Sequence, residues 1–304
     1  MLPVFRPALV PLLAALLVVP LTALVDTHRA DVEAWRKKHE ADYRREYVSL
    51  AGLFFLSPGA NSAGSAATNA VVLPASVPAS IGAFVLDKAE NGAVRFEPAA
   101  GADVTLKGAR VTAPVTLTSD EQDHPDELES GGVTFWLHES GARRAIRLRD
   151  EHSEIARAFA GFRWFPIKSR YRVTGHFIKD PAPHQVHTPN LSGDDNTFDT
   201  EGVVSFTLNG RALRLRPVTT RPKRFWFIFR DGTSGKETYE TARFLYADLQ
   251  DDGDVVLDFN EAYNPPCAFN PYTTCPLPPP ENRLTARILA GERAYAAPHA
   301  ATPH

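Results

Sequence analysis

Short runs in which apolar and polar residues alternate follow one another along most of the chain, which is the period of β-strands with one buried face. The clearest hairpins are AFVLDKAENGAVRFEP, with Asn91-Gly92 at its turn, and VVSFTLNGRALRLRP, with Asn209-Gly210. An Asn-Gly pair predicts a type I′ turn, because both residues tolerate the positive φ angles that this turn requires. The continuous apolar run FWFIF at 225–229 predicts a central strand covered on both faces.

Many short strands at close spacing predict a mainly β fold, an antiparallel sandwich or barrel. We expect the β body at residues 51–304. The acidic, turn-rich stretch from 119 to 132 divides it into subdomains at 51–118 and 132–295 if the stretch is a linker rather than a loop. No repeat of fixed period is visible in the sequence, which argues against solenoids and propellers.

One segment ahead of the strands has a helical period instead. Within residues 26–50, apolar and aromatic side chains recur three or four positions apart, at Val32, Trp35, His39, Tyr43 and Tyr47. This spacing predicts an amphipathic helix whose aromatic stripe packs on the body of the protein. Asp26 or Thr27 is the expected N-cap.

The first 25 residues have the layout of an export signal, with a basic residue followed by an uncharged apolar run at 7–25. We expect this segment to form an N-terminal apolar helix that serves either as a cleaved signal peptide or as a membrane anchor, since 19 such residues just span a bilayer. We therefore expect an exported protein, periplasmic or extracytoplasmic, that is tethered to the membrane if the segment is not cleaved.

Charge and ligand-forming residues narrow the function. The net charge is −3 and the basic residues are scattered, which argues against a nucleic-acid partner. His184 and His187 turn to opposite faces of an extended segment, and the acidic stretch 193–202 lacks the Gly and distant Glu of a calcium loop. The sequence therefore predicts no metal and no cofactor.

A first set of candidate site residues follows the apolar run at 225–229. Asp231, Ser234, Tyr239 and Arg243 lie just beyond it, where loops commonly furnish a pocket at the end of a strand. We expect Asp231 and Arg243 to form an ion pair that holds the loop together, which we call the clasp. The remaining N–H donors of Arg243 could then bind a ligand carboxylate. Ser234 is a candidate nucleophile.

A second candidate lies on the strand at 146–149. Arg147 and Arg149 fall on one face, with Asp150 at the strand end. A salt-bridged strand end is the favoured interpretation, and Arg149 is kept as a ligand-binding candidate.

The segment LDFNEAYN carries a third set of polar residues. Asp258 and Asn260 share one face of the predicted strand, and Tyr263 and Asn264 follow where Pro265 ends it. If this strand lies near the one at 225–229, its polar face meets Tyr239 and Arg243 in a cleft. The catalytic candidates are then Asp258 as a base, Tyr239 and Ser234, and the ligand-binding candidates are Arg149, Asp231, Arg243, Asn260, Tyr263 and Asn264. The alternative is a buried hydrogen-bond network that only holds loops in place.

Both cysteines lie in the Pro-rich stretch that follows. Cys267 and Cys275 lack the further Cys or His ligands of a zinc site, and an exported chain meets oxidising conditions. We expect a disulfide between them that reductant breaks, with a lower melting temperature as the result.

Two resemblances to known families add to this picture. Residues 51–74 resemble the early strands of a forkhead-associated domain, although Ser65 stands where that family has its phosphate-binding Arg. The segments RLRDEHSE, GFRWFPI, RDGTSGKETYETARFL and LDFNEAYNPPCAFNPYTTCPLPPPENRL resemble domain-of-unknown-function family 1684, whose bacterial members are often exported. The likeness runs from about residue 35 to about 295 and implies no established activity.

Together these patterns predict a cell-envelope protein that binds a small polar or anionic ligand, with hydrolysis as a further activity. A non-catalytic structural or interaction module with a buried polar network is the alternative. The residues alone do not decide whether the protein is an enzyme.

Overall fold

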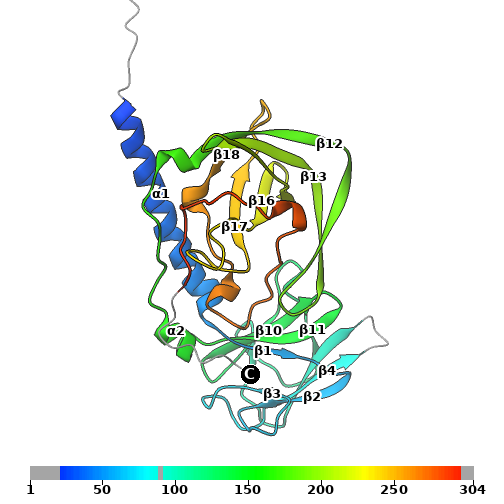
Figure 1. Ribbon diagram of the computed structural model, residues 1–304. Helices are drawn as coiled ribbons and strands as arrows, with labels where there is room; N and C mark the ends of the chain where they lie inside the picture. The colour runs from blue at the N-terminus through cyan, green and yellow to red at the C-terminus, as the bar shows by residue number, and fades with distance from the viewer. Residues whose placement is uncertain (1–20, 88–91, 296–304) are drawn as a thin grey trace, which may run out of the picture.

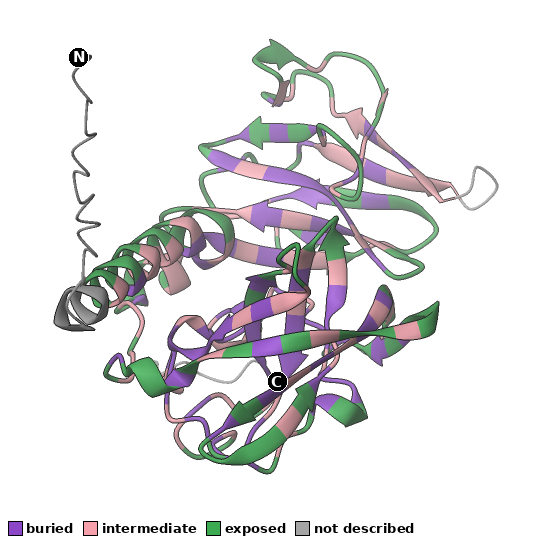
Figure 2. Cartoon of the chain, turned by 90° about the horizontal axis from the view of Figure 1, so that it is seen from above, coloured by how far each residue is buried: buried purple, intermediate pink, exposed green. Residues whose placement is uncertain are grey.

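The computed structural model describes residues 21–87 and 92–295, and these form a two-lobed, mainly β protein (Figure 1). The predicted mainly β fold is confirmed. All four sheets are open, so within the described residues the fold contains no closed barrel. Buried and exposed residues alternate along many strands, as expected for sheets with one face in a core (Figure 2).

The N-lobe holds two sheets. The six-stranded sheet has the order β1 (Leu50–Phe55), β11 (Arg143–Arg149), β10 (Val133–Ser140), β9 (Glu127–Ser130), β6 (Thr105–Leu106) and β7 (Ala109–Arg110). The five-stranded sheet has the order β3 (Val71–Val72), β2 (Gly59–Gly64), β4 (Gly82–Asp87), β5 (Ala93–Pro98) and β8 (Val115–Thr116). Their facing side chains form one core, which includes Phe84, Phe96, Leu128, Phe135 and Ile146.

The C-lobe also holds two sheets. One has the order β14 (Arg211–Leu215), β13 (Asp195–Leu208), β12 (Arg172–Pro189) and β18 (Asp254–Asp258). The other has the order β15 (Val218–Arg221), β16 (Arg224–Phe229) and β17 (Arg243–Asp248). A separate core lies between them and includes Phe206, Phe227, Phe229, Leu257 and Phe259.

Short helical elements connect these strands. They are α2 (Glu154–Ala158) and the 3₁₀ turns at Ser169–Tyr171, Phe259–Glu261, Pro266–Ala268 and Pro280–Asn282.

The local predictions on hairpins and the central strand are confirmed. In the hairpin of β13 and β14, Asn209 has φ 50° and Gly210 has φ 75°, the left-handed pair of a type I′ turn. The hairpin of β4 and β5 also forms, although Asn91 at its turn lies outside the described residues. Strand β16 lies between β15 and β17.

The predicted amphipathic helix forms most of α1 (Leu21–Tyr43), which continues into a π-helical turn, η1 (Arg44–Val48). Its stripe packs as a chain of rings, with centroid separations of 4.7 Å for Trp35–His39, 4.2 Å for His39–Tyr43 and 4.8 Å for Tyr43–Tyr47. The expected cap at Asp26 or Thr27 is wrong, because the helix begins earlier, at Leu21.

The apolar run at 7–25 lies largely outside the described residues. Among the residues that are described, no helix has the length and apolar character needed to cross a membrane.

The Pro-rich segment (residues 259–295) corrects the predicted disulfide. Cys267 and Cys275 are free thiols, and the backbone N–H of Cys267 donates to Sγ of Cys275 at 3.3 Å. The two cysteines are therefore neighbours without a covalent bond, so they do not staple the segment.

Buried asparagines hold this segment instead. Four of them have at most 1% of their surface exposed, namely Asn260, Asn264, Asn270 and Asn282. Nδ2 of Asn270, for example, donates to the carbonyl oxygens of Tyr47 and Leu50, at 2.8 Å each. A short amide side chain that binds backbone groups in this way fixes a segment that has little regular secondary structure of its own.

Candidate functional site

A cleft of about 650 Å³ runs between α1 and the sheets of the C-lobe. Its lining residues come mainly from α1 and from the strands β17 and β18, whose places in the fold Figure 1 shows. Strand β18 supplies Asp254, Val256 and Asp258 to the cleft, while the alternate residues Val255 and Leu257 enter the core of the C-lobe. Side chains alternate between the two faces of a strand, so every second residue of β18 faces the cleft.

Asp258 makes several polar contacts in the cleft. Its Oδ2 is 2.5 Å from Nε2 of His28 on α1, and the Nε of Arg172 on β12 lies 3.8 Å from the same oxygen. Its Oδ1 accepts hydrogen bonds from the backbone N–H of Asn260 at 3.0 Å and from Nδ2 of Asn260 at 2.8 Å. Both carboxylate oxygens are therefore fixed, and the pair with His28 joins α1 to β18.

Glu261 follows one turn later and lines the same cleft. Burial, with a further contribution from the negative charge of Asp258, raises the pKa of Glu261 to about 7. Near neutral pH Glu261 is therefore partly protonated. The neighbouring carboxylate of Asp258 accepts hydrogen bonds from Asn260. Two carboxyl groups whose surroundings differ in this way are the usual requirement for acid and base roles in one site.

A half-buried arginine on α1 supports this arrangement. Arg36 on α1 donates to the backbone oxygens of Asn260, at 3.0 Å, and Phe165, at 3.2 Å. Burial lowers its pKa to about 10, while the charge of Asp258 opposes the shift, so it stays a cation at neutral pH. Its contacts hold the turn that carries Asn260 and Glu261 against the helix.

The lining of the cleft carries an excess of acidic groups. Six carboxylates face two arginines and one histidine, and the charged residues are Asp31, Asp248, Asp252, Asp254, Asp258, Glu261, Arg172, Arg224 and His28. Such a lining favours a neutral or cationic polar ligand over an anionic one, because an anion meets mostly like charge.

Two of the sequence candidates form the predicted clasp, away from the cleft. Nη1 of Arg243 is 2.6 Å from Oδ2 of Asp231, and neither side chain has any exposed surface. The same guanidinium donates to the carbonyl oxygens of Ile288, at 3.1 Å, and Ala290. The clasp therefore ties the β16–β17 loop to the Pro-rich segment, and Nη1 and Nη2 of Arg243 donate to protein groups.

The remaining candidates near that loop are also separate from Asp258. The backbone N–H of Asp231 donates to Oγ of Ser234 at 3.2 Å, which makes the serine part of a turn. The hydroxyl of Tyr239 donates to the carbonyl oxygen of Cys267 at 3.4 Å. The structure thus does not bring Tyr239, Ser234 and Asp258 together.

The other ligand-binding candidates are distributed over the molecule. The guanidinium of Arg149 lies over the ring of Trp136, 4.8 Å from its centroid, in the N-lobe. Asn264 is fully buried, and its backbone N–H and Nδ2 each donate to the carboxylate of Glu292 at 2.8 Å. Tyr263 lines a second, smaller cavity. Of the ligand-binding candidates, Asn260 is the one that contacts Asp258, through two hydrogen bonds.

Sequence reasoning missed His28 and Glu261. His28 lies in a charged helical stretch, 230 positions from its partner Asp258, so no local pattern could reveal the pair. Glu261 had a local signal, since it follows Asp258 by three residues in a segment with little other charge.

Fold and cleft define a two-lobed, mainly β protein with a polar cleft between a helix and a sheet. The chain belongs to the family described as Protein of unknown function (DUF1684), whose model matches residues 157–293. Asp258 and Glu261 lie inside the matched range, and His28 lies outside it. The likeness of residues 51–74 to a forkhead-associated domain finds no support.

A search of curated proteins finds no match to the chain. Five chains of solved structures match. One is the solution NMR structure of an uncharacterized protein from Haloarcula marismortui, with 30% sequence identity over 46% of this chain and 80% of that chain and a TM-score of 0.39.

Proposed function

We propose that the protein binds a small polar molecule in the cleft beside α1. The observation that carries this proposal is the group formed by His28, Asp258 and Glu261 in a cleft of about 650 Å³. A cavity of this size, with a few convergent polar groups and a carboxyl group of raised pKa, is the usual form of a small-molecule site. The acidic lining favours a ligand with hydroxyl or amine groups.

Thermal-shift measurements on the full chain test this proposal. A panel of small sugars, amino alcohols and amines is screened, and we expect at least one to raise the melting temperature. Asp258→Asn and Glu261→Gln should abolish that shift, because they remove charges that face the ligand. Asp251→Asn, a change on a side chain that is 93% exposed and outside the cleft lining, should leave it intact. If Asp258→Asn keeps every ligand-dependent shift, the cleft is not the binding site.

Hydrolysis is a second candidate function, favoured by the contrast between the two carboxyl groups. In this scheme the Asp258–His28 pair takes the proton of an attacking water, and Glu261 donates a proton to the leaving atom. Because the pKa of Glu261 is about 7, its protonated fraction falls as the pH rises through 7. With the ligand identified, kcat should fall above pH 7 and Glu261→Gln should lower it by roughly 100-fold or more. A bound ligand that is recovered unchanged would leave binding as the function.

The alternative, a module with a buried polar network, is favoured by the Asp231–Arg243 clasp and the buried asparagines. It predicts that the cleft variants change only the melting temperature and that no ligand of the panel binds.

We propose further that the protein works in the cell envelope, because the apolar run at 7–25 has the layout of an export signal. Fractionation of a bacterial host that expresses the full chain tests this, together with N-terminal sequencing of the product. We expect the protein in the periplasm if the segment is cleaved and in the membrane if it is kept. Full-length protein in the cytoplasm would contradict export.

A further inference from the structure

A second cavity of about 210 Å³ lies where α1, both lobes and the Pro-rich segment meet. It is lined by Tyr43, Tyr47, Arg147, Trp226, Phe244, Tyr246, Tyr263, Pro266, Thr273, Thr274, Cys275 and Pro276. Six of these twelve side chains are aromatic, and Arg147 is the one charged residue among them. The cavity is smaller than the roughly 300–1,000 Å³ of pockets for drug-sized molecules, so its ligand is small.

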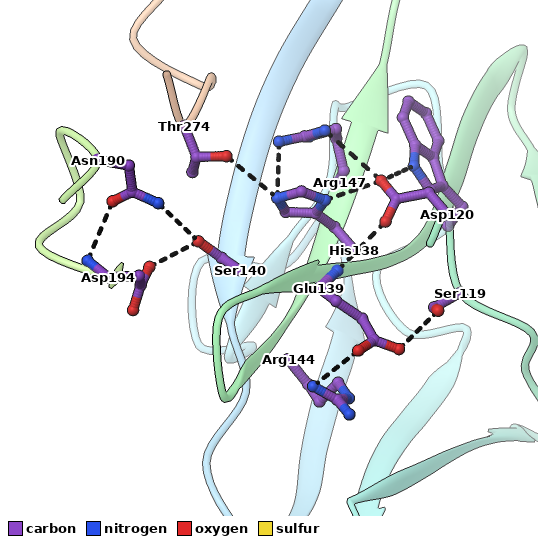
Figure 3. Close-up of polar contacts among 11 residues, drawn as sticks. Ser119, Asp120, His138, Glu139, Ser140, Arg144, Arg147, Asn190, Asp194 and Thr274 are labelled. Atoms are coloured by element: carbon purple, nitrogen blue, oxygen red, sulfur yellow. Dashed lines mark hydrogen bonds and ion pairs between the residues drawn. The ribbon is translucent and has the colours of Figure 1, made fainter. Parts of the chain in front are cut away.

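Arg147 reaches this cavity from β11 in the N-lobe, and a set of buried polar groups fixes its position (Figure 3). Its Nη2 donates to Nε2 of His138 at 2.8 Å, and its Nη1 lies 3.5 Å from Oδ2 of Asp120. Since an arginine only donates, Nε2 of His138 is the acceptor, and Nδ1 of the ring donates to Asp120 at 2.8 Å. Nε1 of Trp136 donates to the same carboxylate at 3.2 Å.

This set leaves one donor of Arg147 unused. Its Nε is buried and makes no hydrogen bond to any described residue. Since Arg147 lines the cavity, an acceptor on a bound ligand could take this N–H.

The phenol groups of the lining point to the same ligand chemistry. Burial raises the pKa of Tyr47 to about 12 and the pKa of Tyr43 and Tyr263 well above the normal value. These hydroxyls therefore stay neutral, and they remain able to donate. No Asp or Glu belongs to the cavity lining, and the carboxylate of Asp120, which pairs with Arg147, lies outside it.

We propose that this cavity binds a small monocarboxylate, with its carboxylate on the guanidinium of Arg147 and its apolar body against the aromatic rings. Arginine suits this role because it carries five N–H donors, of which the contacts to His138 and Asp120 use two, so Nε and further N–H groups remain for the two carboxylate oxygens. A cationic ligand, which six aromatic rings could otherwise attract, is disfavoured by the positive charge of Arg147. The site is separate from the acidic cleft, although Tyr246 contributes to both linings.

Calorimetric titration of the full chain with benzoate tests this proposal. Benzamide has nearly the same shape without the charge, and we expect it to bind at least tenfold more weakly. Tetramethylammonium should not bind. Because Trp226 lines the cavity, benzoate should also change the tryptophan fluorescence of the protein, and Trp226→Phe should remove that change.

Variants locate the site. Arg147→Met should weaken benzoate binding at least tenfold, whereas Arg149→Met, two positions along the same strand and outside the cavity lining, should not. If Arg147→Met fails to fold, the ratio of benzoate to benzamide affinity in the unchanged protein still decides the question. Equal affinities, stronger binding of tetramethylammonium, no binding of benzoate, or retained benzoate binding in a folded Arg147→Met protein would each overturn the proposal. Loss of benzoate binding in Asp258→Asn would also overturn it, since it would place the ligand in the cleft.

Discussion

Arg243→Met is expected to lower the free energy of unfolding by about 3–5 kcal/mol, the usual cost of removing one partner of a buried ion pair. The carboxylate of Asp231 would then lie in the interior without its counter-charge, since both side chains have no exposed surface. The carbonyl oxygens of Ile288 and Ala290 would also lose a donor. Urea denaturation of the full chain, followed by far-UV circular dichroism, measures the change.

An exposed pair serves as the control. Lys223 and Asp251 also form an ion pair, but their side chains are 60% and 93% exposed, and water screens such pairs. Lys223→Met should therefore leave the midpoint of the urea transition unchanged. If Arg243→Met lowered the free energy of unfolding no more than Lys223→Met does, the clasp would not stabilise the fold as expected.

The clasp was predictable from sequence because its members are close along the chain. Asp231 and Arg243 follow and begin two strands that pair directly, with Phe229 opposite Arg243 in the register. Any antiparallel pairing of these strands brings the two side chains near each other. The hairpins at Asn209-Gly210 and the aromatic stripe of α1 were predictable for the same reason, since turn chemistry and helical period are local properties.

The cleft was only half predictable. The alternation along β18 indicated that Asp258 lies on a polar face, but His28 comes from the start of α1 and depends on how that helix docks on the C-lobe. The expected partners Tyr239, in the β16–β17 loop, and Arg243, at the start of β17, donate to carbonyl oxygens of the Pro-rich segment instead. Proximity to a strand end predicts that polar groups gather there, but it does not predict which of them a later segment of the chain buries.

The aromatic cavity depends on an even larger set of distant contacts. Arg147 and Arg149 are equivalent in the sequence, because they lie two apart on one face of β11. Only the docking of the C-lobe on the N-lobe gives Arg147 a place in the cavity, while Arg149 remains over the ring of Trp136. Residues of α1 line both the cleft and the aromatic cavity. Both proposed sites therefore depend on how this helix packs against the rest of the protein.

Asn282→Ala is expected to destabilise the protein by about 3 kcal/mol, because a buried backbone group that loses its partner costs about 1–3 kcal/mol. Oδ1 of Asn282 accepts the backbone N–H of Arg216 at 2.8 Å, and Nδ2 donates to the carbonyl oxygens of Arg216, at 2.8 Å, and Ile228, at 3.0 Å. Three backbone groups of the C-lobe thus depend on one side chain that is 1% exposed. Thermal and urea unfolding of the full chain measure the loss, and Asn196→Ala, at a half-buried position on β13, should change stability little.

The same experiment decides how the Pro-rich segment is held. Since Cys267 and Cys275 are free thiols, reductant should leave the melting temperature of the unchanged protein where it is. The network of asparagines would then be the device that fixes this segment, in place of the disulfide that the composition suggested. A fall in melting temperature under reductant as large as the one caused by Asn282→Ala would show instead that the cysteines bond and that the asparagines are secondary. The asparagine network predicts the opposite order of effects, because each amide donates to backbone carbonyl oxygens.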